Sequence, residues 1–226
     1  MASARTDPRP RHRAATASAV PPAVLPLLLL ALLATACAHK PQPDEPRDLC
    51  AVLEQYPEWY DHARASEERW GTPIPIQMAF VYQESTFRAT VRPPRERLLG
   101  IIPWRRPTSA YGYAQAQDPV WSEYLEDAAR WDAHRTQMQD ALDFIGWYNR
   151  RSHDRLGIAL NDAERLYLAY HEGHGGYERG TYEAKPGLQR IAADVERMAW
   201  RYEEQLEDCE ADLRCRHWYQ FWPFCR

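Results

Sequence analysis

The chain has 226 residues, with 28 lysines and arginines against 32 aspartates and glutamates, and a net charge of −4. Its composition, 45% hydrophobic and 27% charged, is that of a globular protein and excludes a wholly disordered chain or a polytopic membrane protein. The length predicts one domain with a real core, and the charge gives no whole-chain signal for nucleic-acid binding. Five cysteines are an odd number, so one of them has no disulfide partner.

Residues 1–36 have the pattern of a signal peptide. Four arginines and one aspartate precede an apolar run at 23–36, which at about 14 residues is too short to span a bilayer. Small residues lie directly before Cys37, as in the lipobox of bacterial lipoproteins, and this resemblance implies that Cys37 carries a lipid anchor. Ala38 is not the aspartate that retains such proteins at the inner membrane, so we expect a periplasm-facing protein on the outer membrane. The alternative is an ordinary signal peptide, which would leave Cys37 as a spare thiol.

Without residues 1–36 the chain has 190 residues and a net charge of −7. Residues 37–48 are polar and proline-rich, as expected of a tether between an anchored cysteine and a domain at 49–226. The other cysteines predict two disulfides in an exported protein, with three possible pairings. These candidates are Cys50, Cys209, Cys215 and Cys225. One cysteine opens the domain and three close it, so at least one bridge should join its two ends.

Beyond the tether, apolar residues recur at helical spacing, while alternating runs of strand length are scarce. The pattern predicts an all-α domain with at most a minor β-hairpin. The expected helices span residues 49–56, 60–70, 75–87, 119–131, 136–149, 162–171 and 187–210. Asp118 should cap one helix ahead of Pro119, where the missing N–H costs nothing. Asn161 and Glu164 form a capping box for another helix, which Gly173 should end.

Glu84 is the first candidate for catalysis, because it ends an otherwise apolar helix. Removal from water raises the pKa of a carboxyl group and keeps its acid form available near neutral pH, as a proton donor to a leaving oxygen requires. A surface glutamate at a helix end is the alternative. Two further stretches stand out, at 109–115 and 168–173.

Together the three stretches resemble the signature of the goose-type lysozyme and soluble lytic transglycosylase family, the SLT domain family. That signature runs Glu-Ser, then Gly-Leu-Met-Gln, then Ala-Tyr-Asn-x-Gly. The matching residues, in the same order, are Glu84-Ser85, Gly112-Tyr113-Ala114-Gln115 and Ala169-Tyr170-His171-Glu172-Gly173. The sequence departs from the signature at Tyr113-Ala114 and at His171.

The resemblance implies a lysozyme-like helical domain that binds the glycan strands of peptidoglycan without a cofactor or a metal. Glu84 would be the catalytic acid, and Tyr170 would hold its carboxyl group by a hydrogen bond. Ser85 and Gln115 would contact the sugar or its N-acetyl group. Gly112 would let the backbone approach the glycan closely.

The same resemblance, over roughly residues 70–205, implies cleavage of the β-1,4 bond between N-acetylmuramic acid and N-acetylglucosamine. Most glycosidases need two carboxylates, whereas a lytic transglycosylase uses one acid/base. The substrate's N-acetyl group supports the cationic intermediate and the 6-hydroxyl of the muramic acid attacks, which leaves a 1,6-anhydro end. Glu172 and Glu183 lie near the third stretch and could instead serve a hydrolytic muramidase. A non-catalytic peptidoglycan-binding or assembly lipoprotein is the remaining alternative, and no protein partner is indicated.

Aromatic side chains are abundant, with nine tryptophans and thirteen tyrosines. Ring faces stack on the C–H surfaces of sugars, so some of these side chains should line a sugar cleft. Tyr111 and Tyr113 are the best candidates, and core packing is the alternative for each.

Metal-binding patterns are weak in this sequence. A zinc site is an alternative for the cysteines, but the sequence has no CxxC pair. His171 and His174 are three residues apart instead of four, and glycines interrupt the helix there, so they do not form the zincin arrangement.

The segment 92–106 interrupts the helical pattern, with five arginines around an apolar stretch at 98–104. A basic, apolar-tipped loop on an acidic domain suggests binding to anionic lipid headgroups or to the carboxylates of a wall polymer. The alternative is a loop whose apolar residues pack inward while its arginines stay in water.

Overall fold

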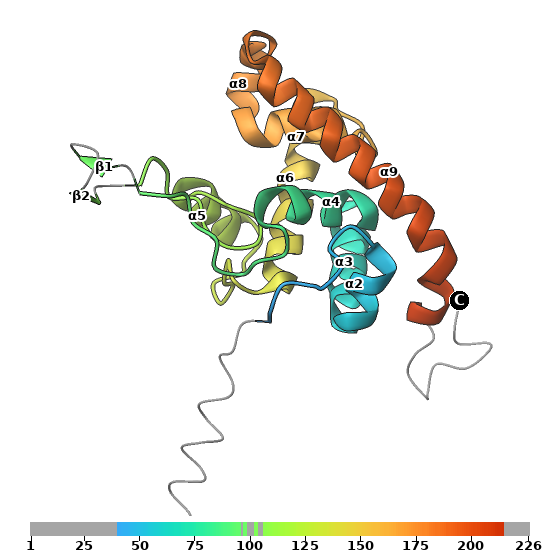
Figure 1. The fold of residues 1–226 in the computed structure, drawn as a ribbon. Helices are drawn as coiled ribbons and strands as arrows, with labels where there is room; N and C mark the ends of the chain where they lie inside the picture. Colours follow the sequence, from blue (N-terminus) through green and yellow to red (C-terminus); the bar gives the residue numbers. More distant parts are fainter. Residues whose placement is uncertain (1–39, 96, 99–101, 104–105, 215–226) are drawn as a thin grey trace, which may run out of the picture. The chain divides into compact units, whose positions relative to one another are not determined.

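A computed structural model of the chain describes residues 40–95, 97–98, 102–103 and 106–214. The expected signal peptide, Cys37, Cys215 and Cys225 lie outside the described residues, as do Arg105 and most of the apolar stretch 98–104. The described part is predominantly helical, which confirms the all-α class (Figure 1). Its α-helices are α2 (Leu49–Gln55), α3 (Pro57–Trp70), α4 (Ile74–Ser85), α5 (Asp118–Asp127), α6 (Met138–Leu156), α7 (Ala163–Glu172), α8 (His174–Glu178) and α9 (Pro186–Arg214). No helix among these is both long and apolar enough to cross a membrane.

A minor hairpin and one 3-10 turn complete the described elements. Strands β1 (Arg97–Leu98) and β2 (Ile102–Pro103) pair antiparallel within the basic segment, with Arg97 opposite Pro103. This pair confirms the expected hairpin. Helix α8 and the 3-10 turn η2 (Thr181–Ala184) were not expected, because glycines at 173, 175, 176 and 180 mark this stretch as a loop.

Helix α4 is the centre of the core. Every residue from Ile74 to Val81 is buried, so this part of the helix is covered on all sides, as expected of a helix surrounded by others. The long helix α9 packs along α4 and α7, while α3 packs against α6 (Figure 1). Because α4 is covered on all sides, the position of its last turn, which carries Glu84, is fixed by the whole core.

Both of the predicted helix caps are wrong by one residue. Asp118 is the first residue of α5, not its cap, and its carboxylate pairs with Arg135 at 2.6 Å. Helix α7 is capped by Asp162 and not by Asn161, because the Asp162 carboxylate accepts from the backbone N–H of Arg165. Gly173 ends α7 as expected, at a φ of 72° that favours glycine.

A buried carboxylate joins α3 and α5 to α6. Asp143 is 6% exposed. Its oxygens accept from the Tyr124 hydroxyl at 2.8 Å and from the Trp70 indole at 2.8 Å, and they pair with Arg69. A charge buried this deeply is stabilised only when hydrogen-bond donors occupy its acceptor sites. These contacts of Asp143 therefore fix α5 relative to the core.

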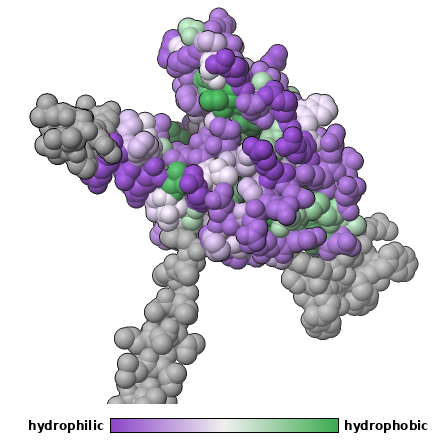
Figure 2. Space-filling model, in the orientation of Figure 1, coloured by the Kyte–Doolittle hydropathy of each residue, from purple (hydrophilic) through white to green (hydrophobic). Residues whose placement is uncertain are grey.

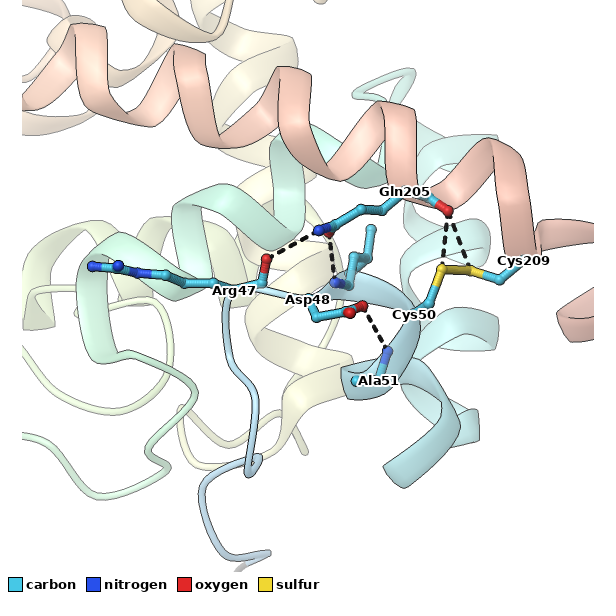
Figure 3. The surroundings of a disulfide bond; sticks show 7 residues. Arg47, Asp48, Cys50, Ala51, Gln205 and Cys209 are labelled. Carbon is cyan, nitrogen blue, oxygen red and sulfur yellow. Dashed lines mark hydrogen bonds between the residues drawn. A yellow bond between two sulfur atoms is a disulfide. The ribbon is translucent and has the colours of Figure 1, made fainter.

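A disulfide between Cys50 and Cys209 joins α2 to α9 (Figure 3). It confirms the expectation that a bridge ties the two ends of the domain, since 159 residues separate the two cysteines. Gln205 reinforces the junction: it accepts from the backbone N–H of Leu49 at 2.8 Å and donates to the carbonyl of Arg47 (Figure 3).

The described part of the expected tether is bound to the domain. Lys40 forms an ion pair with Glu58, and the Tyr56 hydroxyl donates to the carbonyl of Pro41 at 2.9 Å. Pro43 is buried. Residues 40–48 are therefore part of the folded unit, which corrects this part of the expected tether, while residues 37–39 lie outside the described residues.

Candidate active site

Glu84 lies in the last turn of α4, where its carboxyl group is removed from water. The residue as a whole keeps some exposed surface, but the protein surrounds the carboxyl group itself. Burial raises the pKa of Glu84 from 4.5 to about 7, and a hydrogen bond from the Tyr167 hydroxyl opposes part of that rise. Acid and carboxylate forms are therefore both populated near neutral pH, as expected of a group that gives and takes a proton.

Tyr167 and Tyr170 lie three residues apart on α7 and face the same helix, α4. The rings of both stand edge-on to Phe80, each at 5.4 Å between centroids. Tyr167 makes the hydrogen bond to Glu84, whereas the Tyr170 hydroxyl donates to the carbonyl of Ala114 at 2.5 Å. The contact that the family resemblance implied for Tyr170 thus belongs to Tyr167, and Tyr170 instead joins α7 to the second motif.

Ser85 lies in the interior of the protein. It is 2% exposed, and its hydroxyl donates back to the carbonyl of Val81 at 3.1 Å. The chain then turns sharply, because Thr86 and Phe87 have φ values of 50° and 58°, which non-glycine residues rarely adopt. Phe87 is fully buried, so packing holds a strained turn immediately after the candidate acid.

Gly112 is required by the fold. Its φ is +82°, and a Cβ atom there would lie 2.0 Å from the carbonyl oxygen of Arg135. Tyr113, next to it, donates its backbone N–H to the same oxygen at 3.1 Å. Gly112 and Tyr113 thus hold two segments of the protein together, and the expected approach of Gly112 to a glycan stays a prediction.

The two candidate stacking tyrosines have different surroundings. Tyr113 is 2% exposed, its ring stands edge-on to Trp59, and burial raises its pKa to about 12, so it belongs to the core. Tyr111 keeps a partly exposed ring, over which the Arg92 guanidinium lies at 3.7 Å from the centroid. Only Tyr111 retains a ring surface near solvent.

A groove of about 190 Å³ brings the second and third motifs together. Gln115 lines it from the second motif, and its amide nitrogen donates to the carbonyls of Gly112 and Val91. Tyr170 lines it from the third motif, beside Tyr148, whose ring centroid is 5.0 Å away. Tyr148 was missed in the sequence because its helix, α6, contributes no motif.

Glu172 also lines the groove, in surroundings opposite to those of Glu84. Its side chain is 4% exposed, and the Lys185 ammonium lies 2.8 Å from both carboxylate oxygens. The Thr181 hydroxyl donates to one of the same oxygens. Hydrogen bonds from Lys185 and then Thr181 lower the pKa of Glu172 to about 2, so this group is a carboxylate throughout the physiological range.

The two histidines of the third motif region have separate surroundings. His174 stacks on Tyr148 at 4.5 Å and its Nε2 atom lies 2.9 Å from the Ser152 hydroxyl, while His171 is exposed beside Glu172. Among the described residues, no three His, Cys, Asp or Glu side chains gather where they could hold a metal ion.

The sequence from residue 25 to residue 209 matches the family described as the transglycosylase SLT domain. This match covers more than half of the chain and contains all three motifs, so the chain belongs to this family. No curated protein and no solved structure matches the chain. Membership confirms the resemblance and identifies a transglycosylase-type, lysozyme-like domain of the class that acts on peptidoglycan.

Proposed function

We propose that this protein is a peptidoglycan lytic transglycosylase that cleaves between N-acetylmuramic acid and N-acetylglucosamine and leaves a 1,6-anhydro end. The observation that carries the proposal is the desolvated Glu84, with a pKa of about 7, at the end of the central helix. Glu84 in its acid form donates a proton to the glycosidic oxygen as the bond to C1 breaks. The resulting carboxylate takes the proton of the muramic acid 6-hydroxyl as that oxygen bonds to C1, so the acid is regenerated and no water is consumed.

One carboxyl group suffices for both steps because its pKa is close to the working pH. A stronger acid would be ionised before the first step, and a weaker one would be a better base but a poorer donor. The Tyr167 hydroxyl fixes the orientation of the carboxyl group by hydrogen bonding.

Glu172 supports transglycosylation over hydrolysis. A hydrolase needs a second carboxylate that activates water or attacks the sugar. Both oxygens of Glu172 are bound by Lys185, and a carboxylate with a pKa of about 2 is a weak base. In the proposed mechanism Glu172 holds the wall of the groove and takes no proton.

Substrate binding is proposed for the groove beside Tyr170. The carbonyl oxygen of Gln115 and the aromatic wall of Tyr148 and Tyr170 provide a polar acceptor and apolar ring surfaces, the combination that a sugar requires. Tyr111 is the remaining candidate for stacking outside the groove. Ser85 and Gly112 act through the backbone turns that they stabilise.

We also propose that Cys37 carries a lipid and holds the domain on the periplasmic side of the outer membrane. The disulfide supports an oxidising compartment. Only two residues separate Cys37 from Lys40, which already contacts the domain, and they reach about 10 Å when extended. The active site would then act on glycan strands close to the membrane. Palmitate labelling that is lost in Cys37→Ser supports the anchor, and equal labelling of both proteins contradicts it.

Product analysis tests the proposed activity. Purified peptidoglycan is digested with the wild type and with Glu84→Gln, and the soluble muropeptides are identified by mass spectrometry. We expect anhydro-muropeptides from the wild type only. Reducing ends would identify a muramidase, and binding without release of any product by either protein would identify a non-catalytic wall-binding protein.

A further inference from the structure

Tyr148 forms part of the groove wall although no motif marks it. The residue is 6% exposed, so most of its ring is packed inside the protein and only a small surface is left for the groove. Its hydroxyl donates to the carbonyl of Ala169 at 3.1 Å, and burial raises its pKa to about 12, so it keeps its proton. The ring stands edge-on to Tyr170, at 5.0 Å between centroids. A sugar in the groove would therefore contact a ring whose position depends on its neighbours.

His174 covers one face of the Tyr148 ring. It is the first residue of α8, and its imidazole is stacked on the phenol ring with 4.5 Å between centroids and 21° between planes. Gly173 brings the chain to this position, because it ends α7 and precedes His174 at a φ of 72°. The two stacked rings come from α6 and α8, so this contact is made only in the folded protein.

The imidazole is itself held in one orientation. Its Nε2 atom lies 2.9 Å from the hydroxyl oxygen of Ser152, which is fully buried one turn after Tyr148 on α6. That hydroxyl donates its single proton to the carbonyl of Tyr148 at 3.0 Å, so the imidazole is the donor in the contact with Ser152. Stacking on its face and a hydrogen bond at its edge thus fix His174.

His174 is mostly uncharged at neutral pH. Burial lowers its pKa, and Arg151 and Arg155 on α6 lower it further, while Glu178 on α8 and Glu123 on α5 oppose them. The imidazole is not among the described side chains that line the groove, so it does not exchange a proton with a sugar bound there. Any effect of His174 on the groove is therefore exerted through the Tyr148 ring.

Helix α8 lies at the top of the view in Figure 1, and the face of the protein seen from this side is mostly hydrophilic with small apolar patches (Figure 2). A tyrosine ring that has an uncovered face beside water can change its side-chain rotamer to bury that face. Without the imidazole, the groove wall would lose its fixed shape at Tyr148. A sugar would then have to order this ring as it binds, at a cost in affinity.

We propose that His174 is a positioning residue for sugar binding, which fixes the Tyr148 ring in the groove wall. This inference rests on the proposed function, because it takes the groove beside Tyr170 as the glycan site. Loss of the imidazole should weaken glycan binding about fivefold, the size of effect that one stacked aromatic pair has. The rate of bond cleavage should stay the same, because the carboxyl group of Glu84 is bound by Tyr167 and not by His174.

Glycan binding tests the inference directly. Soluble glycan strands are titrated into the full-length protein carrying Glu84→Gln, so that no cleavage occurs, with and without a change at His174. We expect His174→Ala to raise the Kd about fivefold, and His174→Phe, which keeps a ring on Tyr148, to restore it to within about twofold. Tyr177→Ala is the matched control, because Tyr177 also belongs to α8 but stacks on Tyr182, at 5.0 Å, and does not line the groove. Its Kd should equal that of the parent protein.

Ser152→Ala gives a second test through the other partner of the imidazole. It removes a hydrogen bond and leaves both rings, so the Kd should rise only about twofold. In a protein that already carries His174→Phe, the same change should leave the Kd unaltered. Urea unfolding shows whether His174→Ala is folded, and if it is not, this pair of variants decides.

Kinetics separate this inference from the proposed function. With Glu84 intact, His174→Ala should raise KM about fivefold and leave kcat unchanged. Equal glycan affinity with and without the imidazole, or an equal loss in Tyr177→Ala, overturns the inference, while cleavage by the wild type leaves the proposed function in place. Glycan binding that depends on His174, in a protein that cleaves nothing, supports the inference and contradicts the proposed function. No glycan binding by the parent protein contradicts both.

Discussion

Glu84 and Glu172 end two helices whose aromatic rings meet, and the protein gives them opposite properties. Glu84 lies among rings of α4 and α7, and burial raises its pKa to about 7. Glu172 contacts Lys185 and Thr181, which lower its pKa to about 2. The difference shows that the surroundings, not the residue type, decide which carboxyl group can donate a proton.

The largest effect on activity should come from replacing the carboxyl group of Glu84 by an amide. Glu84→Gln removes the proton donor and should lower the rate of cleavage by at least about 100-fold. Glu172→Gln, the matched change at the other helix end, should retain activity within about tenfold, because its carboxylate takes no proton. Rates are measured as release of soluble muropeptides. Equal losses in the two variants would show that the enzyme needs both carboxylates.

Stability should respond to pH in opposite directions at the two sites. The pKa of Glu84 in the folded protein, about 7, is above its unfolded value of 4.5, so the folded state binds the proton more tightly and loses stability as pH rises from about 4.5 to about 7. Glu84→Gln lacks this loss. Its free energy of unfolding relative to wild type should therefore increase by as much as about 3 kcal/mol between pH 4 and pH 8. Urea unfolding across this range checks it, and a pH-independent difference would contradict the buried carboxyl group.

Glu172 should change the free energy of unfolding with pH in the opposite direction, and by a smaller amount. Its folded pKa of about 2 is below the unfolded value, so its contribution is complete above pH 4.5 and is lost as pH falls toward 2. We expect Glu172→Gln to lower the free energy of unfolding by about 1 to 2 kcal/mol at pH 7. The difference from wild type should shrink in acid. Lys185→Met should reproduce most of the loss, and an unchanged stability of both variants would contradict the ion pair.

The smallest effect concerns the orientation of Glu84. Tyr167→Phe removes the hydrogen bond that lowers the pKa of Glu84, so the decline of kcat/KM at high pH should move upward by less than about one pH unit. Tyr170→Phe is the control: it removes a hydroxyl that bonds to Ala114, so the decline should stay in place. A shift in Tyr170→Phe and none in Tyr167→Phe would reverse the roles assigned to the two side chains.

Much of the fold could be predicted from the sequence, because the long helices have apolar residues at helical spacing and helix-breaking residues lie between them. The unexpected elements are short and glycine-rich, and α8 and η2 take their structure from packing against α7 and α9. The cap of α7 differs by one residue because Asn161 and Asp162 are both good caps, and local pattern does not choose between them.

The candidate site was predicted as a set of motifs and less well as a set of contacts. Glu84 and its raised pKa follow from an apolar helix and could be inferred locally. The role of Tyr167 depends on how α7 packs on α4, and the glycine at 112 is required by Arg135, which is 23 residues away in the chain. Tyr113 is in the core because its ring packs against Trp59, which is also distant in the chain. Such contacts between distant segments leave no local signal.

Digestion of peptidoglycan in water labelled with oxygen-18 tests most directly whether Glu84 acts alone. Intramolecular attack by the 6-hydroxyl consumes no water, so the account predicts muropeptides that carry no label at the new end and are one water lighter than hydrolysis products. Labelled reducing ends would contradict it, since they form only when water attacks the sugar in place of the 6-hydroxyl.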